Sequence, residues 1–151
     1  MRRQIRFLLI SVVLLTGCDR STLMHSYQPI KENCWNRTDT IKFNLPSLDT
    51  EDRCHVLIGL RVTNIFPYEF LVMEVRQNYQ NPISHRVDTI KYQLTDKSGN
   101  FTEKGLNYFQ YETQGVPLDF KKGQTGEITI RHLMHKEELP GIMDVGVCVI
   151  R

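Results

Sequence analysis

An alternation of apolar and polar residues with a period of two is the feature that most constrains the fold of this chain. From Trp35 onward very little of the sequence has the spacing of an amphipathic helix, and apolar residues instead recur at every second position. Because successive side chains of a strand point to opposite faces, each such run predicts a strand with a buried face. The runs lie at residues 41–45, 56–62, 70–75, 90–94, 128–130 and 145–149.

Turn-forming residues separate these runs, at positions 46–52, 64–68, 81–82, 96–100, 121–126 and 140–141. Short strands joined by such turns predict an all-β domain built as an antiparallel β-sandwich, immunoglobulin-like or jelly-roll-like. A closed barrel is the alternative, and the uneven loop lengths favour two sheets. Residues 133–139 would form one or two helical turns between the last strands.

The first 17 residues have the organisation of a bacterial lipoprotein signal peptide. Three arginines in the first six residues precede an apolar stretch at residues 7–15, which is too short to cross a bilayer of ~30 Å as a helix. Leu15-Thr16-Gly17-Cys18 follows and resembles the lipobox, in which small residues precede the cleavage point and a thiol follows it. We therefore expect removal of residues 1–17 and lipidation of Cys18, whose acyl chains would anchor the protein in a membrane.

The segment after the lipidation site shows no sustained period and contains a proline. We expect residues 18–33 to be a tether, with Tyr27 as a residue that docks on a β-sandwich domain at residues 34–151. Asp19 stands alone after Cys18, unlike the acidic cluster of surface-exported lipoproteins. This favours an inward-facing, periplasmic position.

The composition excludes several classes of protein. Hydrophobic residues make up 40% and charged residues 24%, values typical of a globular domain and too apolar for intrinsic disorder. Residues 1–17 carry three arginines and no acidic residue, so their removal changes the formal net charge from +2 to −1. No concentrated positive face remains to bind nucleic acid. A single short apolar run excludes a polytopic membrane protein.

Three cysteines remain after Cys18, so at most one internal disulfide can form. A Cys34–Cys54 bond would close a loop of about 20 residues, whereas Cys148 lies opposite the valine face of the last strand, where we expect a buried thiol. The histidines and cysteines lack the Cys-x-x-Cys and His-Glu-x-x-His spacings of metal sites. With no nucleophile or phosphate-loop signature either, we predict no metal, no other cofactor and no enzymatic activity.

Polar and aromatic residues gather where one predicted strand ends. Arg61 lies at the end of the strand, Asn64, Pro67 and Tyr68 follow on a loop that should be exposed, and Asp144 precedes the last strand. These residues are candidates for binding a partner. The interpretation that we favour is structural: Arg61 and Asp144 pair across strands, and Asn64 closes an Asx turn.

With these residues in view, the chain resembles the gliding-motility lipoprotein GldH family of Bacteroidetes. The resemblance runs nearly end to end behind the lipobox, and its distinctive segments are residues 60–68 and 139–146. Val62 departs from the asparagine that the family often carries there, and the additional cysteines are not part of the family pattern. The further matching residues are Asp19, Tyr27, Trp35, Asp39-Thr40, Asp88-Thr89-Ile90, Tyr92 and His132-Leu133-Met134.

The resemblance implies a lipid-anchored outer-membrane protein that acts as a non-catalytic interaction or assembly component. Its partners would be envelope proteins of the machinery for gliding or for the related type IX secretion. Asp39-Thr40-Ile41 and Asp88-Thr89-Ile90 also resemble the acceptor motif for protein O-glycosylation in Bacteroidetes, which makes Thr40 and Thr89 candidate modification sites.

Two alternatives from other functional classes stay open. A carbohydrate- or peptidoglycan-binding sandwich would use Trp35, Asn64 and Tyr68 to contact a glycan. An exposed aromatic row near Arg61 would favour it, whereas burial of Trp35 would count against it. An envelope hydrolase would need two or three titratable groups that converge in a cleft, and the sequence supplies no such cluster.

Overall fold

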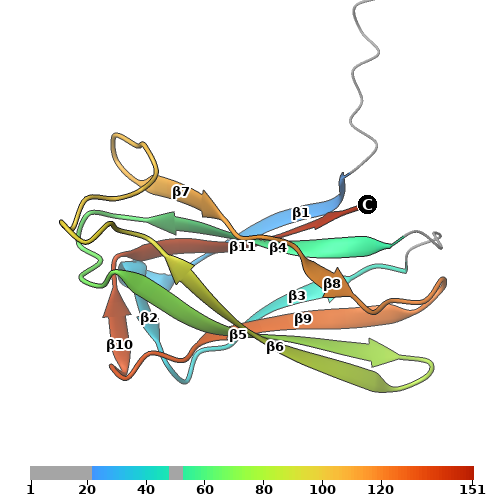
Figure 1. Cartoon of the computed structure of the whole chain (residues 1–151). Coiled ribbons are helices and arrows are strands. Elements are labelled where there is room, and N and C mark those ends of the chain that lie inside the picture. The colour runs from blue at the N-terminus through green and yellow to red at the C-terminus, as the bar shows by residue number, and fades with distance from the viewer. Residues whose placement is uncertain (1–21, 48–52) are drawn as a thin grey trace, which may run out of the picture.

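The computed structural model describes residues 22–47 and 53–151, which form a two-layered β-sandwich (Figure 1). In the layer that we call the first sheet, the strands follow the order β1–β11–β4–β7, and β8 also pairs with β4. All of these pairs are antiparallel. The strands are β1 (Thr22–Pro29), β4 (Cys54–Val62), β7 (Phe109–Glu112), β8 (Val116–Leu118) and β11 (Ile142–Ile150).

The second sheet has the order β3–β9–β5–β6 and is also antiparallel. Its strands are β3 (Ile41–Leu45), β5 (Phe70–Gln80), β6 (Ser84–Gln93) and β9 (Thr125–His132). After the 3₁₀ turn η2 (Lys31–Asn33), a short ladder joins β2 (Cys34–Asn36) to β10 (Glu138–Pro140). The prediction of an all-β antiparallel sandwich is confirmed.

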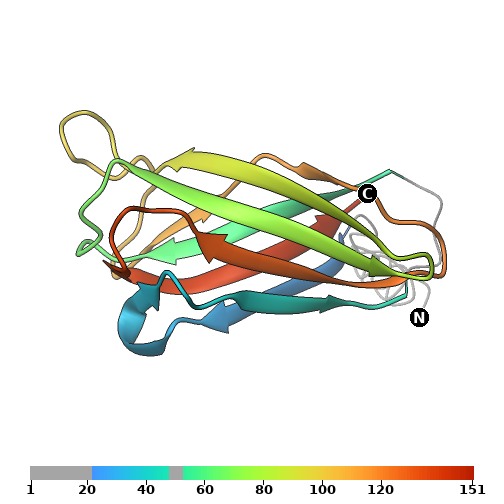
Figure 2. The same cartoon turned by 90° about the horizontal axis from the view of Figure 1, so that it is seen from below.

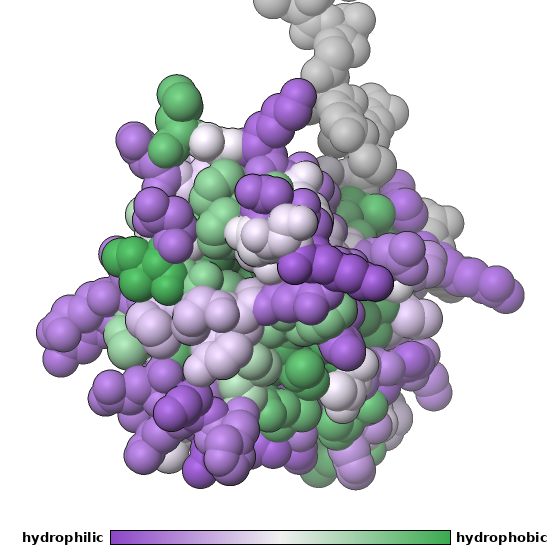
Figure 3. All heavy atoms as spheres, turned by 60° about the vertical axis from the view of Figure 1, so that its left-hand side comes forward, coloured by the Kyte–Doolittle hydropathy of each residue, from purple (hydrophilic) through white to green (hydrophobic). Residues whose placement is uncertain are grey.

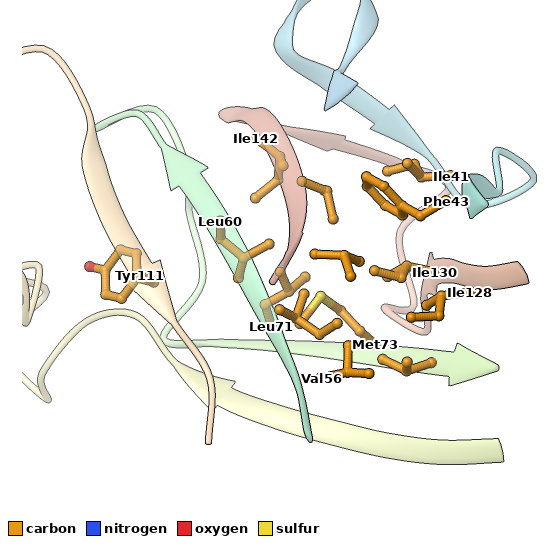
Figure 4. Close-up of a cluster of buried hydrophobic side chains, with 14 of the residues drawn as sticks. Ile41, Phe43, Val56, Leu60, Leu71, Met73, Tyr111, Ile128, Ile130 and Ile142 are labelled. Atoms are coloured by element: carbon orange, nitrogen blue, oxygen red, sulfur yellow. The ribbon is translucent and has the colours of Figure 1, made fainter. Parts of the chain in front are cut away.

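The core lies between the two sheets (Figure 4). The alternating apolar positions of the predicted strands are the ones that face it, as β3 shows with its strict alternation of buried and exposed residues. Strand β4 contributes Val56, Ile58 and Leu60, all fully buried, and β9 contributes Ile128 and Ile130. Burial of this apolar surface is the main stabilising contribution to the fold.

The predicted helix at residues 133–139 is wrong. Residues 133–137 are irregular, and Glu138 begins β10. Leu139 is fully buried and lies opposite Trp35 of β2. Tertiary pairing therefore decides the conformation of a segment whose local sequence tolerates either structure.

The predicted tether at residues 18–33 is also too long, because Thr22–Pro29 forms β1 and pairs with β11. This strand escaped the sequence pattern because its residues are at most half-buried, so that no alternation of buried and exposed positions marks it. The sandwich therefore begins at Thr22. Among the described residues, no helix is long and apolar enough to cross a membrane.

The sandwich has two ends, which we call the N-terminal end and the distal end (Figures 1 and 2). Strand β1 begins where Thr22 pairs with Ile150 and finishes where Pro29 pairs with Asp144. The N-terminal end also holds the β5–β6 turn and residues 119–124 between β8 and β9. The distal end holds the β4–β5 loop, the β6–β7 loop and the turn between β10 and β11.

Candidate partner-binding site

Arg61 and Asp144 lie side by side on the outer face of the first sheet. They are paired in register on β4 and β11, and their neighbours Leu60 and Val145 point into the core. Arg61 Nη1 is 3.6 Å from Asp144 Oδ2, and the two side chains are 33% and 18% exposed. A charge-assisted hydrogen bond would be about 2.8 Å long, so this ion pair leaves N–H donors of the guanidinium uncommitted. Within the described part of the chain, Arg61 Nε is buried and has no hydrogen-bond partner.

Two tyrosines flank the same guanidinium. Arg61 Cζ is 4.5 Å from the ring centroid of Tyr27 on β1 and 5.6 Å from that of Tyr108, which directly precedes β7. Both distances fall within the range of cation–π contacts. The planar cation is therefore held in place by aromatic rings.

The ring of Tyr27 rests on two glycines, Gly59 and Gly146, which form a cross-strand pair. A Cβ atom at Gly59 would lie 2.1 Å from Tyr27 Oη, and one at Gly146 would lie 2.6 Å from Tyr27 Cε1. Only glycine leaves room for a ring at this distance from the sheet. Burial raises the pKa of Tyr27 above its usual value, with Arg61 acting in the opposite direction. The phenol is therefore neutral at physiological pH.

The remaining candidate residues lie on the β4–β5 loop at the distal end. Asn64 and Pro67 are exposed, and Tyr68 is half-buried against Phe66 with 5.7 Å between ring centroids. The side-chain acceptor in this turn is Thr63 Oγ1, to which the N–H two residues later donates at 3.4 Å. The structure thus pairs Arg61 with Asp144. Asn64 and Pro67, which follow Arg61 in the chain, are open to solvent, and Tyr68 packs against the core.

Sequence reasoning missed Gly59 and Tyr108. A glycine within an apolar strand is a known sign of close approach by another group, and Gly59 interrupts such a strand. Residues 109–112, directly after Tyr108, alternate aromatic and polar side chains, but the run is too short to distinguish a strand from a loop.

Trp35 and His132 form a buried corner beneath the ladder of β2 and β10. Both side chains are fully buried, with 5.3 Å between ring centroids in an edge-to-face arrangement. Trp35 Nε1 donates to the Asp39 carbonyl at 3.1 Å, and His132 Nε2 lies 3.1 Å from the Trp35 carbonyl. Burial lowers the pKa of His132. Since the buried Trp35 cannot stack on a sugar, its position counts against the glycan-binding alternative.

The candidate Cys34–Cys54 disulfide is not formed, and Cys34 is a free thiol. Cys34 lies at the distal end, next to the β10–β11 turn, whereas Cys54 begins β4 at the N-terminal end. The length of β4 separates them by about 26 Å at ~3.3 Å per residue, whereas a disulfide needs Cα atoms within about 7 Å. Cys148 is a free thiol that is half-buried on the outer face of the first sheet, and its burial raises its pKa.

The remaining candidate sites are Thr40, Thr89 and Cys18. Thr40 and Thr89 are both exposed, Thr40 directly before β3 and Thr89 on β6. Cys18 lies outside the described residues. Across residues 22–47 and 53–151, no group of three or more His, Cys, Asp or Glu side chains could hold a metal ion.

Comparison with known proteins identifies the family. The sequence profile described as GldH lipoprotein matches residues 22–149. The chain belongs to the GldH lipoprotein family. One curated relative is the gliding motility lipoprotein GldH of Flavobacterium johnsoniae, 25% identical over 146 residues that cover 92% of this chain and 91% of the relative. No solved structure matches the chain.

Both distinctive segments of the GldH resemblance meet at the Arg61 site. Residues 60–62 and 142–145 pair as neighbouring strands β4 and β11. Beyond them, the Thr63 N–H donates to the Gly141 carbonyl at 2.8 Å. A Cβ atom at Gly141, which has a φ of +89°, would lie 2.5 Å from Phe66 N. Segments that are about 80 residues apart in the chain therefore build one continuous structural unit.

Proposed function

We propose that this member of the GldH lipoprotein family is anchored by acyl chains on Cys18 to the outer membrane and faces the periplasm. There it acts as a non-catalytic interaction or assembly component of machinery for gliding or for related type IX secretion. The observation that carries the proposal is the family match over residues 22–149. The two segments that distinguish the GldH resemblance converge on Arg61, which makes this residue the candidate contact. The full-length resemblance to a protein named for gliding motility supports it.

The Arg61 site has the chemistry of a recognition site for an oxygen acceptor. Its guanidinium is positioned by two rings and shares its charge with one carboxylate at a distance of 3.6 Å. Arginine presents five donors in a rigid fork that suits carboxylates. An acidic side chain, a chain terminus or an exposed carbonyl of a partner protein would satisfy the remaining donors.

Lipid anchoring supplies the mechanism of assembly. Confinement to one membrane surface raises the effective concentration of the domain against partners on that surface, so modest contacts suffice for a lasting complex. Neither confinement to the membrane surface nor binding of a partner requires a cofactor or a chemical reaction.

Crosslinking in intact cells tests this proposal. Proteins bound to the lipoprotein are captured and identified by mass spectrometry, and Cys18→Ala serves as the unanchored control. We expect gliding or type IX secretion components, absent from the Cys18→Ala sample. Recovery of glycan alone, or of nothing stable, would contradict the assembly role.

A matched pair of arginine variants tests the site. Arg61→Gln removes the cation from the first sheet, whereas Arg131→Gln removes an exposed arginine that pairs with Glu74 on the outer face of the second sheet. We expect Arg61→Gln to reduce partner recovery at least several-fold and Arg131→Gln to leave it unchanged. Equal recovery with both variants would exclude Arg61 as a contact.

A further inference from the structure

The turns at the N-terminal end of the sandwich combine an exposed isoleucine with two lysines. Ile83, on the β5–β6 turn, is 84% exposed. Lys121 and Lys122 are exposed on the loop between β8 and β9. We call residues 81–83 and 119–124 together the basal turns.

Gln124 fixes the two basal turns to each other. Its side chain is only 3% exposed, its Nε2 donates to the Pro82 carbonyl at 3.2 Å, and its Oε1 accepts from the Lys121 N–H at 2.8 Å. The isoleucine and the lysines therefore belong to one rigid surface. Asp119, the acidic residue of the basal turns, is paired with Arg86 at 3.0 Å, so its charge is compensated within the domain.

The basal turns lie at the end of the sandwich from which the chain leads to Cys18. Thr22 begins β1 and pairs with Ile150, which in turn pairs with His55 on β4. Next to these residues, β8 leads directly into the basal turns (Figure 2). Four residue steps separate Cys18 from Thr22, and a fully extended chain spans at most about 3.6 Å per residue. A lipid on Cys18 would therefore hold this end within about 14 Å of the membrane.

We infer that the basal turns rest on the membrane that holds the lipid anchor, with Ile83 at the boundary between headgroups and acyl chains. Lys121 and Lys122 contact anionic phospholipid headgroups beside it, since lysine side chains place their charge at the interface while their stems remain in apolar surroundings. Apolar side chains flanked by lysines are typical of elements that lie in this boundary. The inference rests on the proposed lipidation and adds a second contact, which fixes the orientation of the domain on the membrane.

Tryptophan substitutions at the two ends of the sandwich test the inference. The native Trp35 is buried near the distal end and serves as an internal reference. Ile83→Trp reports on the basal turns. Leu106→Trp is the matched control, because Leu106 is fully exposed on the loop that leads into β7 at the distal end.

Each lipidated full-length variant is reconstituted into vesicles of phosphatidylethanolamine and phosphatidylglycerol, with and without bromine on the upper acyl chain. We expect bromine to remove about half of the added emission of Ile83→Trp, because such elements reach ~5–10 Å into the boundary. Emission of the wild type and of Leu106→Trp should not change. Quenching of Ile83→Trp no greater than that of Leu106→Trp would overturn the inference.

A charge variant and a mass measurement complete the design. Lys121→Gln with Lys122→Gln, in the Ile83→Trp background, should reduce the quenching, and unchanged quenching would exclude the headgroup contact. The acylated Cys18 peptide is identified by mass spectrometry before reconstitution. If it is absent, the anchoring on which both proposals depend fails; if it is present without quenching, only the membrane contact fails.

Discussion

Replacing Gly59 by alanine tests whether the ring of Tyr27 depends on the glycine pair beneath it. The new Cβ atom would lie 2.1 Å from Tyr27 Oη and 2.6 Å from Tyr27 Cζ, distances that no unstrained structure allows. The ring must therefore move away from β4, and its contact with Arg61 at 4.5 Å is lost.

The size of the effect follows from opposing contributions. Overpacking costs about 1–3 kcal/mol, and loss of a partly exposed cation–π contact costs about 0.5–1 kcal/mol. Alanine in place of glycine in a strand lowers the entropy of the unfolded chain, which offsets about 0.5–1 kcal/mol of this destabilisation. We expect a net loss of about 1–3 kcal/mol in the free energy of unfolding, and each kcal/mol should lower Tm by roughly 3–6 °C in a domain of this size.

A double-mutant cycle with Tyr27→Ala isolates the free-energy cost of the clash between the new Cβ atom and the ring of Tyr27. Urea unfolding of residues 19–151 is measured for the wild type, both single variants and the double variant. Without the ring, Gly59→Ala should be neutral or stabilising by up to ~1 kcal/mol. Equal destabilisation in the presence and absence of the ring would refute the reasoning.

Three further predictions use the same stability assay. Because burial depresses the pKa of His132 below its usual 6.5, the unfolded chain takes up the proton first. Stability should therefore fall as the pH drops through and below 6.5, and the exposed-residue variant His135→Gln should keep this dependence. Since Cys34 is a free thiol, a reducing agent should leave the urea midpoint unchanged, and a lower midpoint would indicate a structural disulfide. Gly141→Ala should cost more than 1 kcal/mol, because the residue has a φ of +89° and its Cβ would lie 2.5 Å from Phe66 N; a neutral result would contradict that backbone geometry.

The sequence predicts those parts of the fold that bury one apolar face. Strands such as β3 and β4 could be found because their inward positions are almost uniformly apolar. Strand β1 could not, since its residues are at most half-buried and it lacks the alternation of buried and exposed positions that marks β3. The possible Cys34–Cys54 disulfide could not be judged from the sequence for a related reason: spacing along the chain says nothing about which end of a sandwich a residue occupies.

The candidate site was predictable only as separate residues. Arg61 and Asp144 stood out because they lie at the ends of predicted strands, and their pairing was one of two open interpretations. Their aromatic neighbours come from β1 and from the loop before β7, so only the order of strands in the first sheet reveals them. For Trp35 the residue type was misleading. It suggested a contact with a ligand, but the side chain is fully buried and its position in β2 makes it part of the core.

The early course of the chain would couple the proposed anchor to the site. Strand β1 follows the segment that contains Cys18, runs eight residues along β11 and supplies Tyr27 to Arg61 near its far end. At ~3.3 Å per residue the strand spans about 26 Å, and the tether from Cys18 adds at most about 14 Å. With Cys18 lipidated, Arg61 can therefore reach no farther than about 40 Å from the membrane surface. Under the proposed assembly role, a partner that binds Arg61 must come within that distance of the membrane surface.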